Sequence, residues 1–424
     1  MKIKLPGYIG LLCCMVTCFC VHDLRAQLSP PRVRIMAWNL LNFPSTSGAA
    51  ADSTNRCPYY RTVVNYVNPD ILVTEENSTT YSTTWFLNQV MNSSGNTSYR
   101  QGTFIRSYDS SNGIFYRDSL FRFVQNVPIE TDLRDISEFT LVHKQTGDSI
   151  RIYAVHLKAS SGTSEEQQRA SEVDSLRKVT NRFRTGTEFI VCGDFNIYND
   201  QESAYQKLLQ DNVTDDGNFV DPFTMHGTWN NPSYSDYHTQ STRLNSVGGG
   251  AYGGMNDRFD MILMSKGVMA DTGFKFIPGT MTAVGNDGQH FDESINYGTN
   301  NAVPSNVADA LYWSSDHLPV YAEFLVGSTS GIEEESMDLS SLVLYPNPIS
   351  RNGILSFNLK KAGTIQISLL NSSGQLVQML ANERVQNGQQ DIPINLDPAL
   401  SQGFYILSIN TGNSFIYRKL SIFK

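Results

Sequence analysis

The stretch FIVCGDFN at residues 189–196 decides the fold class of this 424-residue chain. Its four leading apolar residues predict a short buried strand, and Gly193 ends that strand just before the polar residues Asp194 and Asn196. A helix is predicted before it, with an apolar stripe made of Ala170, Val173, Leu176, Val179 and Phe183. A strand that follows a helix at this spacing is typical of an α/β domain whose sheets are covered by helices.

More strands and a second helix are predicted upstream of this unit. The strands are Val33–Ala37, Ile71–Thr74 and the hairpin of Phe139–His143 with Ser149–His156, and the helix is Tyr59–Val67. Ser164-Glu-Glu-Gln167 has the pattern of a capping box at a helix start. Two polar segments, Asn230–Asn256 and Val284–Leu311, are expected to be long loops, and long ordered loops are often functional.

Polar side chains recur at the ends of the apolar strands. They are Asn39, Glu75, Glu76, His156, Asp194, Asn196, Asp260, Asp316 and His317. An α/β sheet gathers strand ends on one rim, so residues this far apart in sequence can converge in one cleft.

This combination of side chains suits the hydrolysis of a phosphate ester. Carboxylate and carboxamide oxygens favour a hard cation such as Mg²⁺, Mn²⁺ or Ca²⁺ over zinc, and such a cation can neutralise a phosphoryl oxygen. An Asp–His pair can position or deprotonate water, and an Asn amide can donate to a developing oxyanion. Each residue taken alone also fits an ordinary turn or solvated loop, but the ordered series favours catalysis.

The motifs resemble those of the endonuclease/exonuclease/phosphatase superfamily and occur in that family's order over nearly all of residues 33–326. They are Trp38-Asn39, Pro69–Glu76, Ala154–Lys158, Gly193-Asp-Phe-Asn196, Arg258-Phe-Asp260 and Ser315-Asp-His-Leu-Pro319. The resemblance implies that residues 31–326 form a four-layered α/β sandwich, in which two packed β-sheets are flanked by helices.

The resemblance also implies a metal site. Glu76 would be the principal ligand, and Asn39 and Asp316 would complete or support the site. Mg²⁺ is the expected ion, with Mn²⁺ and Ca²⁺ as alternatives. Glu75 stands where the family has a glutamine, and this departure adds negative charge beside the metal.

Catalytic roles are carried over from the same motifs. Asp194 would hold or activate the attacking water, and Asn196 would bind the phosphate. His317, oriented by Asp260, would contact the scissile phosphate and assist proton transfer, and His156 would be a second catalytic histidine.

The resemblance leaves the substrate open, with Arg117 and Lys158 expected to bind it. A nuclease is the first interpretation, a phosphodiesterase or phosphatase for lipid headgroups or small phosphoesters the second, and a catalytically silent surface binding protein the third. Residues 28–326 hold 22 Lys and Arg against 33 Asp and Glu, a net charge of −11, which argues against tight DNA binding. Four loop residues could stack on bases or simply pack within their loop: Tyr234, Tyr237, Tyr252 and Arg243.

The first 26 residues predict a secretory signal peptide. Lys2 and Lys4 precede a short apolar run, and Ala26 provides a small residue at the cut. The run is short for a membrane span, so a membrane anchor is the weaker alternative and the mature protein should have no stable span. Of six cysteines only Cys57 and Cys192 then remain, which allows one disulfide and no cysteine-based metal site.

The end of the chain predicts a separate small all-β sandwich at residues 342–424, after a flexible acidic linker at 327–341. Leu342–Pro348, Gly374–Val377, Gly403–Tyr405 and Arg418–Lys424 resemble the type A sorting domain of the type IX secretion system. This implies Sec export and then type IX secretion, to the medium or cell surface of a Bacteroidetes-like bacterium, with the secretion machinery as a partner. A carbohydrate-binding sandwich is the alternative, and a monomer is expected.

Overall fold

Strand β1 (Arg32–Phe43) is buried on both faces because its side chains alternate between two apolar cores. Ile35 and Ala37 pack against residues of a second sheet, whereas Met36 and Trp38 pack against helices. A strand with no polar face needs a packed layer on each side. The sheet that contains β1 therefore lies between a layer of helices and the second sheet.

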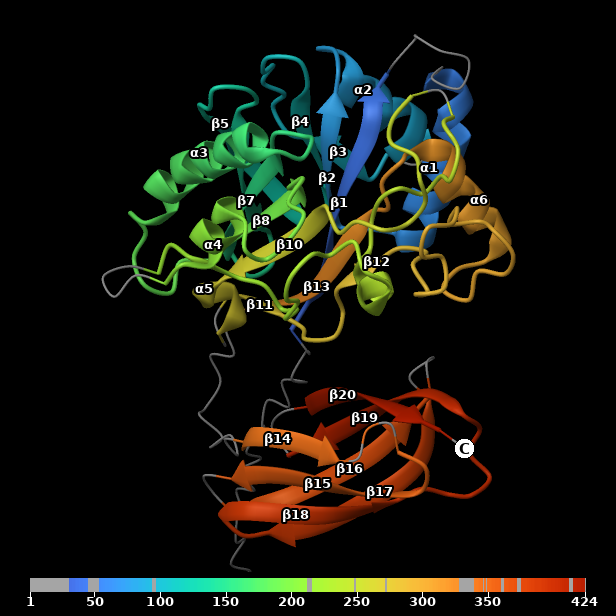
Figure 1. The fold of residues 1–424 in the computed structure, drawn as a ribbon. Helices are drawn as coiled ribbons and strands as arrows, with labels where there is room; N and C mark the ends of the chain where they lie inside the picture. Colours follow the sequence, from blue (N-terminus) through green and yellow to red (C-terminus); the bar gives the residue numbers. More distant parts are fainter. Residues whose placement is uncertain are drawn as a thin grey trace, which may run out of the picture.

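Two mixed sheets form the centre of the structure (Figure 1). The first has the order β11-β13-β1-β2-β4-β3 with β12 paired to β13, and the second has the order β5-β6-β7-β8-β10-β9. The remaining strands of the first sheet are β2 (Ile71–Asn77), β3 (Tyr99–Gln101), β4 (Ser111–Arg117), β11 (Phe274–Phe276), β12 (Thr282–Ala283) and β13 (Val320–Val326). Those of the second are β5 (Phe121–Ile129), β6 (Ile136–His143), β7 (Ser149–His156), β8 (Phe189–Asp194), β9 (Phe219–Val220) and β10 (Asp260–Ser265).

Helices cover the outer face of each sheet. On the first sheet α1 (Ser53–Val67) packs beside α6 (Ser305–Ser314), and on the second α3 (Thr163–Thr180) packs beside α4 (Ser203–Leu209), as Figure 1 shows. Shorter helical segments are α2 (Ser82–Phe86), η1 (Leu87–Met91), η3 (Pro232–Tyr237) and α5 (Lys266–Met269). The result is the four-layered α/β sandwich expected from the sequence.

The structure describes residues 30–44, 53–93, 97–211, 216–247, 249–270, 273–327, 339–345, 347, 349–359, 362–371, 375–411 and 415–423. The predicted signal peptide lies outside these residues, and so does most of the predicted linker. None of the helices in these ranges combines the length and the apolar character needed to cross a membrane.

Two sequence-based expectations are wrong. No capping box forms at Ser164–Gln167, because the N-cap of α3 is Gly162, two residues before Ser164, and the Ser164 hydroxyl donates to Glu165 instead. The segment Val284–Leu311 is not entirely loop, since α6 begins at Ser305 and buries its apolar residues in the core that also holds α1. The one disulfide that the sequence allows does not form, because Cys57 and Cys192 lie in different core layers.

The C-terminal strands form two antiparallel sheets around their own apolar core, as the sequence predicts. One sheet contains β14 (Leu339–Tyr345), β15 (Asn352–Leu359) and β18 (Gly388–Asn395). The other contains β16 (Gly363–Leu370), β17 (Leu376–Val385), β19 (Gly403–Asn410) and β20 (Phe415–Ile422).

A buried ion pair fixes the chain segment that follows β7. The Nε of the fully buried Arg169 donates to Glu202 Oε2 at 2.9 Å, and Nη2 lies 2.8 Å from the same oxygen. Nη1 donates to the carbonyl oxygens of Lys158 and Ser160. This pair therefore joins α3, the start of α4 and the segment just after the end of β7.

We expect Glu202→Gln to lower the free energy of unfolding by about 3 kcal/mol, because it leaves a buried guanidinium without its counter-charge. Asp174→Asn is the matched control: Asp174 pairs with Lys207 on the surface, so its loss should cost less than about 1 kcal/mol. Urea unfolding of the two variants beside the wild type measures both values, and equal losses would contradict the assignment.

Candidate active site

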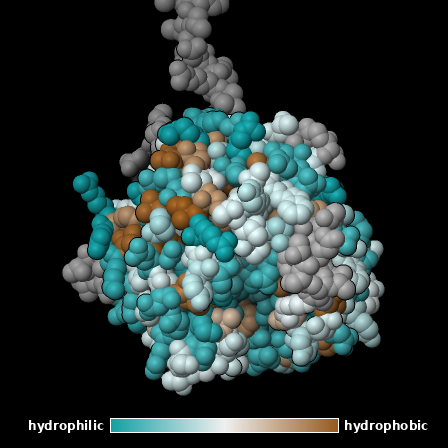
Figure 2. Space-filling view, turned by 90° about the horizontal axis from the view of Figure 1, so that it is seen from above, coloured by the Kyte–Doolittle hydropathy of each residue, from teal (hydrophilic) through white to brown (hydrophobic). Residues whose placement is uncertain are grey.

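Strand ends from both sheets meet at one end of the sandwich. In the first sheet Asn39 pairs in register with Glu75 across the parallel strands β1 and β2. In the second sheet Asp194 pairs with His156 of the parallel neighbour β7 and with Asp260 of the antiparallel neighbour β10. Figure 2 looks onto the end toward which β1 and β2 point in Figure 1, and most of that face is hydrophilic.

The Asp194 carboxylate lies at the centre of the cluster. Its Oδ2 accepts a hydrogen bond from Asn39 Nδ2 at 3.1 Å and lies 3.6 Å from Nε2 of both His156 and His317. The same Asn39 amide donates to Glu76 Oε1 at 3.0 Å, so one amide links the two carboxylates. Residues 39, 76, 156, 194 and 317 therefore form one cluster, as the sequence-based hypothesis requires.

His317 carries a positive charge in this setting. Its Nδ1 lies 2.8 Å from Asp260 Oδ2, so the Nδ1–H group donates a hydrogen bond to that carboxylate. This bond turns Nε2 of the ring toward Asp194. Burial disfavours the imidazolium, but Asp260, Asp194 and Asp316 outweigh that effect and raise the pKa of His317 well above its usual value. An imidazole whose charged form is favoured in this way is suited to holding a phosphoryl oxygen.

His156 has the opposite electrostatics. Its Nε2 lies 3.8 Å from Glu76 Oε1 and 3.6 Å from Asp194 Oδ2, yet burial together with the nearby charges of Arg134 and His317 lowers its pKa well below the usual value. His156 is therefore neutral, and the two imidazoles that flank Asp194 differ in charge.

The carboxyl groups resist ionisation in the absence of other positive charge. Burial, reinforced by neighbouring carboxylates, raises the pKa of Glu75 well above normal and also raises the pKa of Glu76. Burial likewise raises the pKa of Asp194 to about 7, although the charge on His317 opposes this. Asp194 can therefore gain or lose a proton near neutral pH.

Glu75 is the most deeply enclosed of these groups. Its side chain is fully buried, and both carboxylate oxygens lack a hydrogen-bond partner. It faces Gly193 of the opposite sheet, where a Cβ atom would lie 2.8 Å from Glu75 Oε1 and 2.2 Å from the Val155 carbonyl oxygen. Gly193 also has φ +126°, so glycine is required both for space and for backbone conformation.

Two site residues adopt left-handed backbone conformations, Glu76 with φ +58° and Asn196 with φ +51°. The bulge at Glu76 interrupts the pairing of β2 with both neighbours, and the Glu76 carboxylate then accepts the backbone N–H of Asn42 at 2.6 Å. Asn196 donates from its side chain to Leu157 O at 3.2 Å. Such strained conformations are common where the fold aims side chains at a ligand.

The donor set fits a hard divalent ion. The Asp316 Oδ1 atom is buried without a hydrogen-bond partner, and Glu76 and the Asn39 amide supply further oxygens. Across the ranges that the structure describes, no three His, Cys, Asp or Glu side chains converge to hold a metal by themselves. Mg²⁺ usually keeps several waters and takes only one or two protein carboxylates, so Glu76 and Asp316 with Asn39 would be sufficient.

The structure places one of the two predicted substrate-binding cations, Arg117, away from this cluster. Arg117 ends β4 at the opposite end of the sheet, where its Nε pairs with Asp70 at 3.0 Å and its guanidinium covers the Tyr99 ring. The ammonium of Lys158 follows β7 but donates to the adjacent Ala159 carbonyl at 2.8 Å. Strand direction explains Arg117, because β4 runs antiparallel to β2 and carries it away from Glu76.

Sequence reasoning missed Gln240. Its side-chain amide lies 2.5 Å from His317 Nε2 and 3.5 Å from Asp316 Oδ2, so it covers the ring atom that would face a phosphate. Nothing in the sequence distinguishes Gln240 from other polar residues of its long loop. Of the four loop residues considered for base stacking, Arg243 is buried and Tyr234 and Tyr237 pack against the second sheet's outer core, which leaves Tyr252 exposed.

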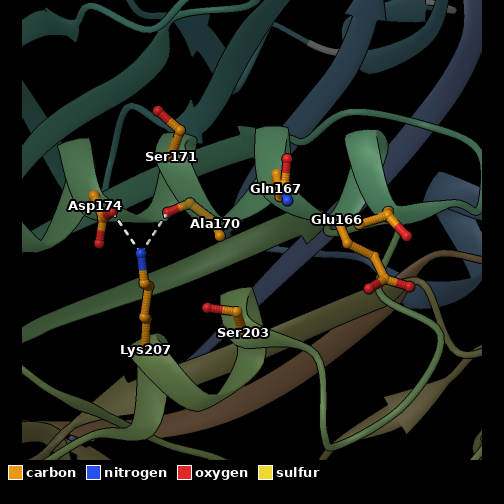
Figure 3. Close-up of a pocket in the computed structure, with 8 residues that line it drawn as sticks. Glu166, Gln167, Ala170, Ser171, Asp174, Ser203 and Lys207 are labelled. Carbon is orange, nitrogen blue, oxygen red and sulfur yellow. Dashed lines mark hydrogen bonds and ion pairs between the residues drawn. The ribbon is translucent and has the colours of Figure 1, made fainter.

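A groove of about 460 Å³ lies elsewhere, between α3 and α4. Figure 3 shows Lys207 of α4 reaching across it to Asp174 and to the Ala170 carbonyl of α3. None of the strand-end residues lines this groove, so the chemistry belongs to the Asp194 cluster instead.

Comparison with protein families gives two matches. Residues 36–317 match the Endonuclease/Exonuclease/phosphatase family, and residues 343–423 match the Secretion system C-terminal sorting domain. No curated protein matches the sequence significantly.

Several solved structures are similar to this chain. Truncated TDP2 from Caenorhabditis elegans is 17% identical with a TM-score of 0.43, and the match covers 70% of this chain and 98% of that one. The human Nocturnin catalytic domain with bound sulfate is 18% identical with a TM-score of 0.44, covering 69% and 93%. A mannosyl-6-phosphatase of Bacteroides thetaiotaomicron is 16% identical with a TM-score of 0.45, covering 69% and 99%.

Asp257 yields a test of the electrostatics beside the site. Its Oδ1 is buried without a partner, and burial together with the charge of Asp292 raises the pKa of Asp257 from 3.8 to about 6. Because folding disfavours the charged form, the wild type should lose stability as the pH rises from about 4 to 6.

We expect Asp257→Asn to be more stable than the wild type at pH 8, by up to about 3 kcal/mol, and to be equally stable below pH 4, where the aspartate is protonated in both states. Urea unfolding at pH 4, 6 and 8 measures the difference. A variant that is less stable than the wild type at pH 8 would show that the charge is stabilising.

Proposed function

Because this chain belongs to the Endonuclease/Exonuclease/phosphatase family, we propose that it is a divalent-metal-dependent phosphodiester hydrolase that cleaves nucleic acid outside the cell. The family's hydrolase fold supports phosphoesterase activity, and enzymes of this family generally use divalent metals. The C-terminal sorting domain indicates type IX secretion to the cell surface or the extracellular space.

The observation that carries this proposal is the position of Asp194 between a charged imidazole, His317, and a neutral one, His156. With a pKa of about 7, Asp194 can accept the proton of an attacking water near neutral pH. The charged His317 ring, held by Asp260, faces the same space and can bind a phosphoryl oxygen as negative charge develops. Asn39 fixes the Asp194 carboxylate through its amide.

A divalent ion held by Glu76, Asp316 and Asn39 would supply positive charge to the phosphoryl oxygen and the leaving alkoxide. Asn39 donates its amide N–H groups to the two carboxylates, which leaves the amide oxygen for the ion, although that oxygen also accepts the Leu41 N–H at 3.0 Å. The raised pKa of Glu76 is the behaviour expected of a ligand that awaits a cation.

The charges of the site favour diesters over monoesters. Among the described residues, the imidazoles of His156 and His317 are the only basic groups that pair with the cluster carboxylates within 4 Å. A monoester dianion usually needs Arg or Lys groups as partners, whereas the single charge of a diester can be met by an imidazolium and a cation.

A phosphodiesterase for small phosphoesters or lipid headgroups is the second candidate. The net charge of −11 over residues 28–326 favours it, because a long polyanion would be repelled except at the site itself. A panel of duplex DNA, single-stranded DNA, RNA, sphingomyelin and inositol phosphates with Mg²⁺, Mn²⁺ or Ca²⁺ separates the two candidates.

We expect Glu76→Gln, Asp194→Asn and His317→Gln each to lower kcat/KM on bis-p-nitrophenyl phosphate by about 10²–10⁴-fold, because each removes a charge from the reacting centre. Added EDTA should abolish the wild-type activity. Arg117→Gln is the control and should keep full activity, since Arg117 lies at the other end of β4. A variant of the first three with the full wild-type rate would be removed from the mechanism.

We also expect the wild type to hydrolyse bis-p-nitrophenyl phosphate at least about tenfold faster than p-nitrophenyl phosphate, because the site offers few cations to a dianion. Initial rates at equal substrate and metal concentrations measure this ratio. Preference for the monoester would instead support a phosphatase.

A further inference from the structure

Two exposed tyrosines stand on neighbouring loops beside the site. Tyr81, 74% exposed, follows Glu76 by five residues, and Tyr108, 76% exposed, precedes β4 by three. Both loops lie at the site end of the first sheet, because Asn77 at the end of β2 pairs with Ser111 at the start of β4. An exposed tyrosine offers a flat apolar face with a polar tip, on which the planar ring of a ligand can stack.

The loop that carries Tyr108 is fixed by hydrogen bonds from residues on both sides of Tyr108 in the chain. Arg106 donates to the Ser78 carbonyl at 3.2 Å, which ties this loop to the loop that carries Tyr81. The carboxylate of Asp109 accepts two hydrogen bonds from the Arg134 guanidinium, at 2.8 and 3.2 Å. Tyr108 is therefore exposed on an ordered support.

The brace continues to the site. Arg134 Nη1 also donates to the carbonyl oxygens of His156 and Leu157, at 3.4 and 3.3 Å. His156 is the residue whose ring lies beside Glu76 and Asp194. Tyr108 is therefore connected to His156 through its neighbour Asp109 and the hydrogen bonds of Arg134.

The turn that carries Tyr81 is equally fixed. The Ser82 hydroxyl donates to the Phe43 carbonyl at 2.9 Å and accepts the Thr79 N–H at 2.9 Å. This ties the turn to the end of β1, next to the strand residues that hold Glu76.

A third exposed tyrosine follows a residue that contacts the cluster. Tyr252 is 66% exposed, and its neighbour Ala251 donates its backbone N–H to Asp316 Oδ2 at 2.6 Å. Exposed tyrosines thus occur on the loop after Glu76, on the loop before β4 and next to the residue that contacts Asp316.

We infer that Tyr81 and Tyr108 form a stacking platform for a planar base on one side of the scissile phosphate, and that Tyr252 serves the group on the other side. The ligand class is a nucleoside phosphodiester, so this inference rests on the proposed function and adds the residues that would hold the base. Serine, threonine and aspartate flank Tyr81 and Tyr108 in the sequence, and this end of the molecule is mostly hydrophilic in Figure 2, which disfavours an acyl chain. Stacking on tyrosine accepts any base and needs no basic surface, so it agrees with the acidic domain.

The experiment compares two diesters with one leaving group, thymidine 5′-(p-nitrophenyl) phosphate and methyl p-nitrophenyl phosphate. Tyr81→Ala and Tyr108→Ala should each lower kcat/KM on the thymidine ester about tenfold, mainly through KM, and leave the methyl ester unchanged. Tyr108→Phe should keep the wild-type value, since the ring and not the hydroxyl is used. Tyr66→Ala, an exposed tyrosine at the end of α1 away from the site, is the matched control.

The outcomes are distinct. Equal losses on both esters, or no loss on either, would overturn the platform. An equal loss on the p-nitrophenyl diester of glucose 6-phosphate would replace the base with a sugar and overturn the assignment to nucleosides. Absence of hydrolysis of the methyl ester by the wild type would instead reject the proposed phosphodiester chemistry itself.

Discussion

Five carboxyl groups and two imidazoles are buried against one another at one end of two packed sheets, and the rest of the structure is arranged to hold them there. Burying so much like charge is unfavourable, and the raised pKa values of Glu75, Glu76 and Asp194 express that cost. The imidazolium of His317 and the amide of Asn39 offset part of it. The negative charge that they do not offset gives the site an affinity for a cation.

The sheets tolerate this electrostatic cost because their centres are well packed and apolar. The parallel pairs β1–β2 and β7–β8 are packed on both faces, and their carboxyl ends point to the same edge. Close approach of the sheets at that edge depends on Gly193, which leaves room for the Glu75 carboxylate. Around the edge, hydrogen-bonded loops replace regular structure, and Arg134 connects one of them to His156.

Electrostatics also connect the site with its environment. The domain is acidic, so under the proposed function the site itself has to attract the anionic substrate, through His317 and the proposed cation. The stacking platform that we infer would add affinity that does not depend on charge or on base identity. Type IX secretion leads to the cell surface or the extracellular space, where salt weakens long-range electrostatic attraction and such contacts would matter more.

The sequence by itself determined an α/β domain with helix-covered sheets, the C-terminal strands and the polar residues that end each strand, because apolar periodicity and strand-end chemistry are local properties of the chain. The four-layered arrangement followed from the family resemblance of its motifs. It also led to Asn39, Glu76, Asp194 and His317, whose convergence follows from strand direction. It could not place Arg117, since that depends on which neighbour β4 pairs with and in which direction. Nor could it find Gln240, whose long loop folds back to pair with His317, just before β13 begins. Tertiary packing decides the position of such a loop, because its sequence carries no periodic pattern.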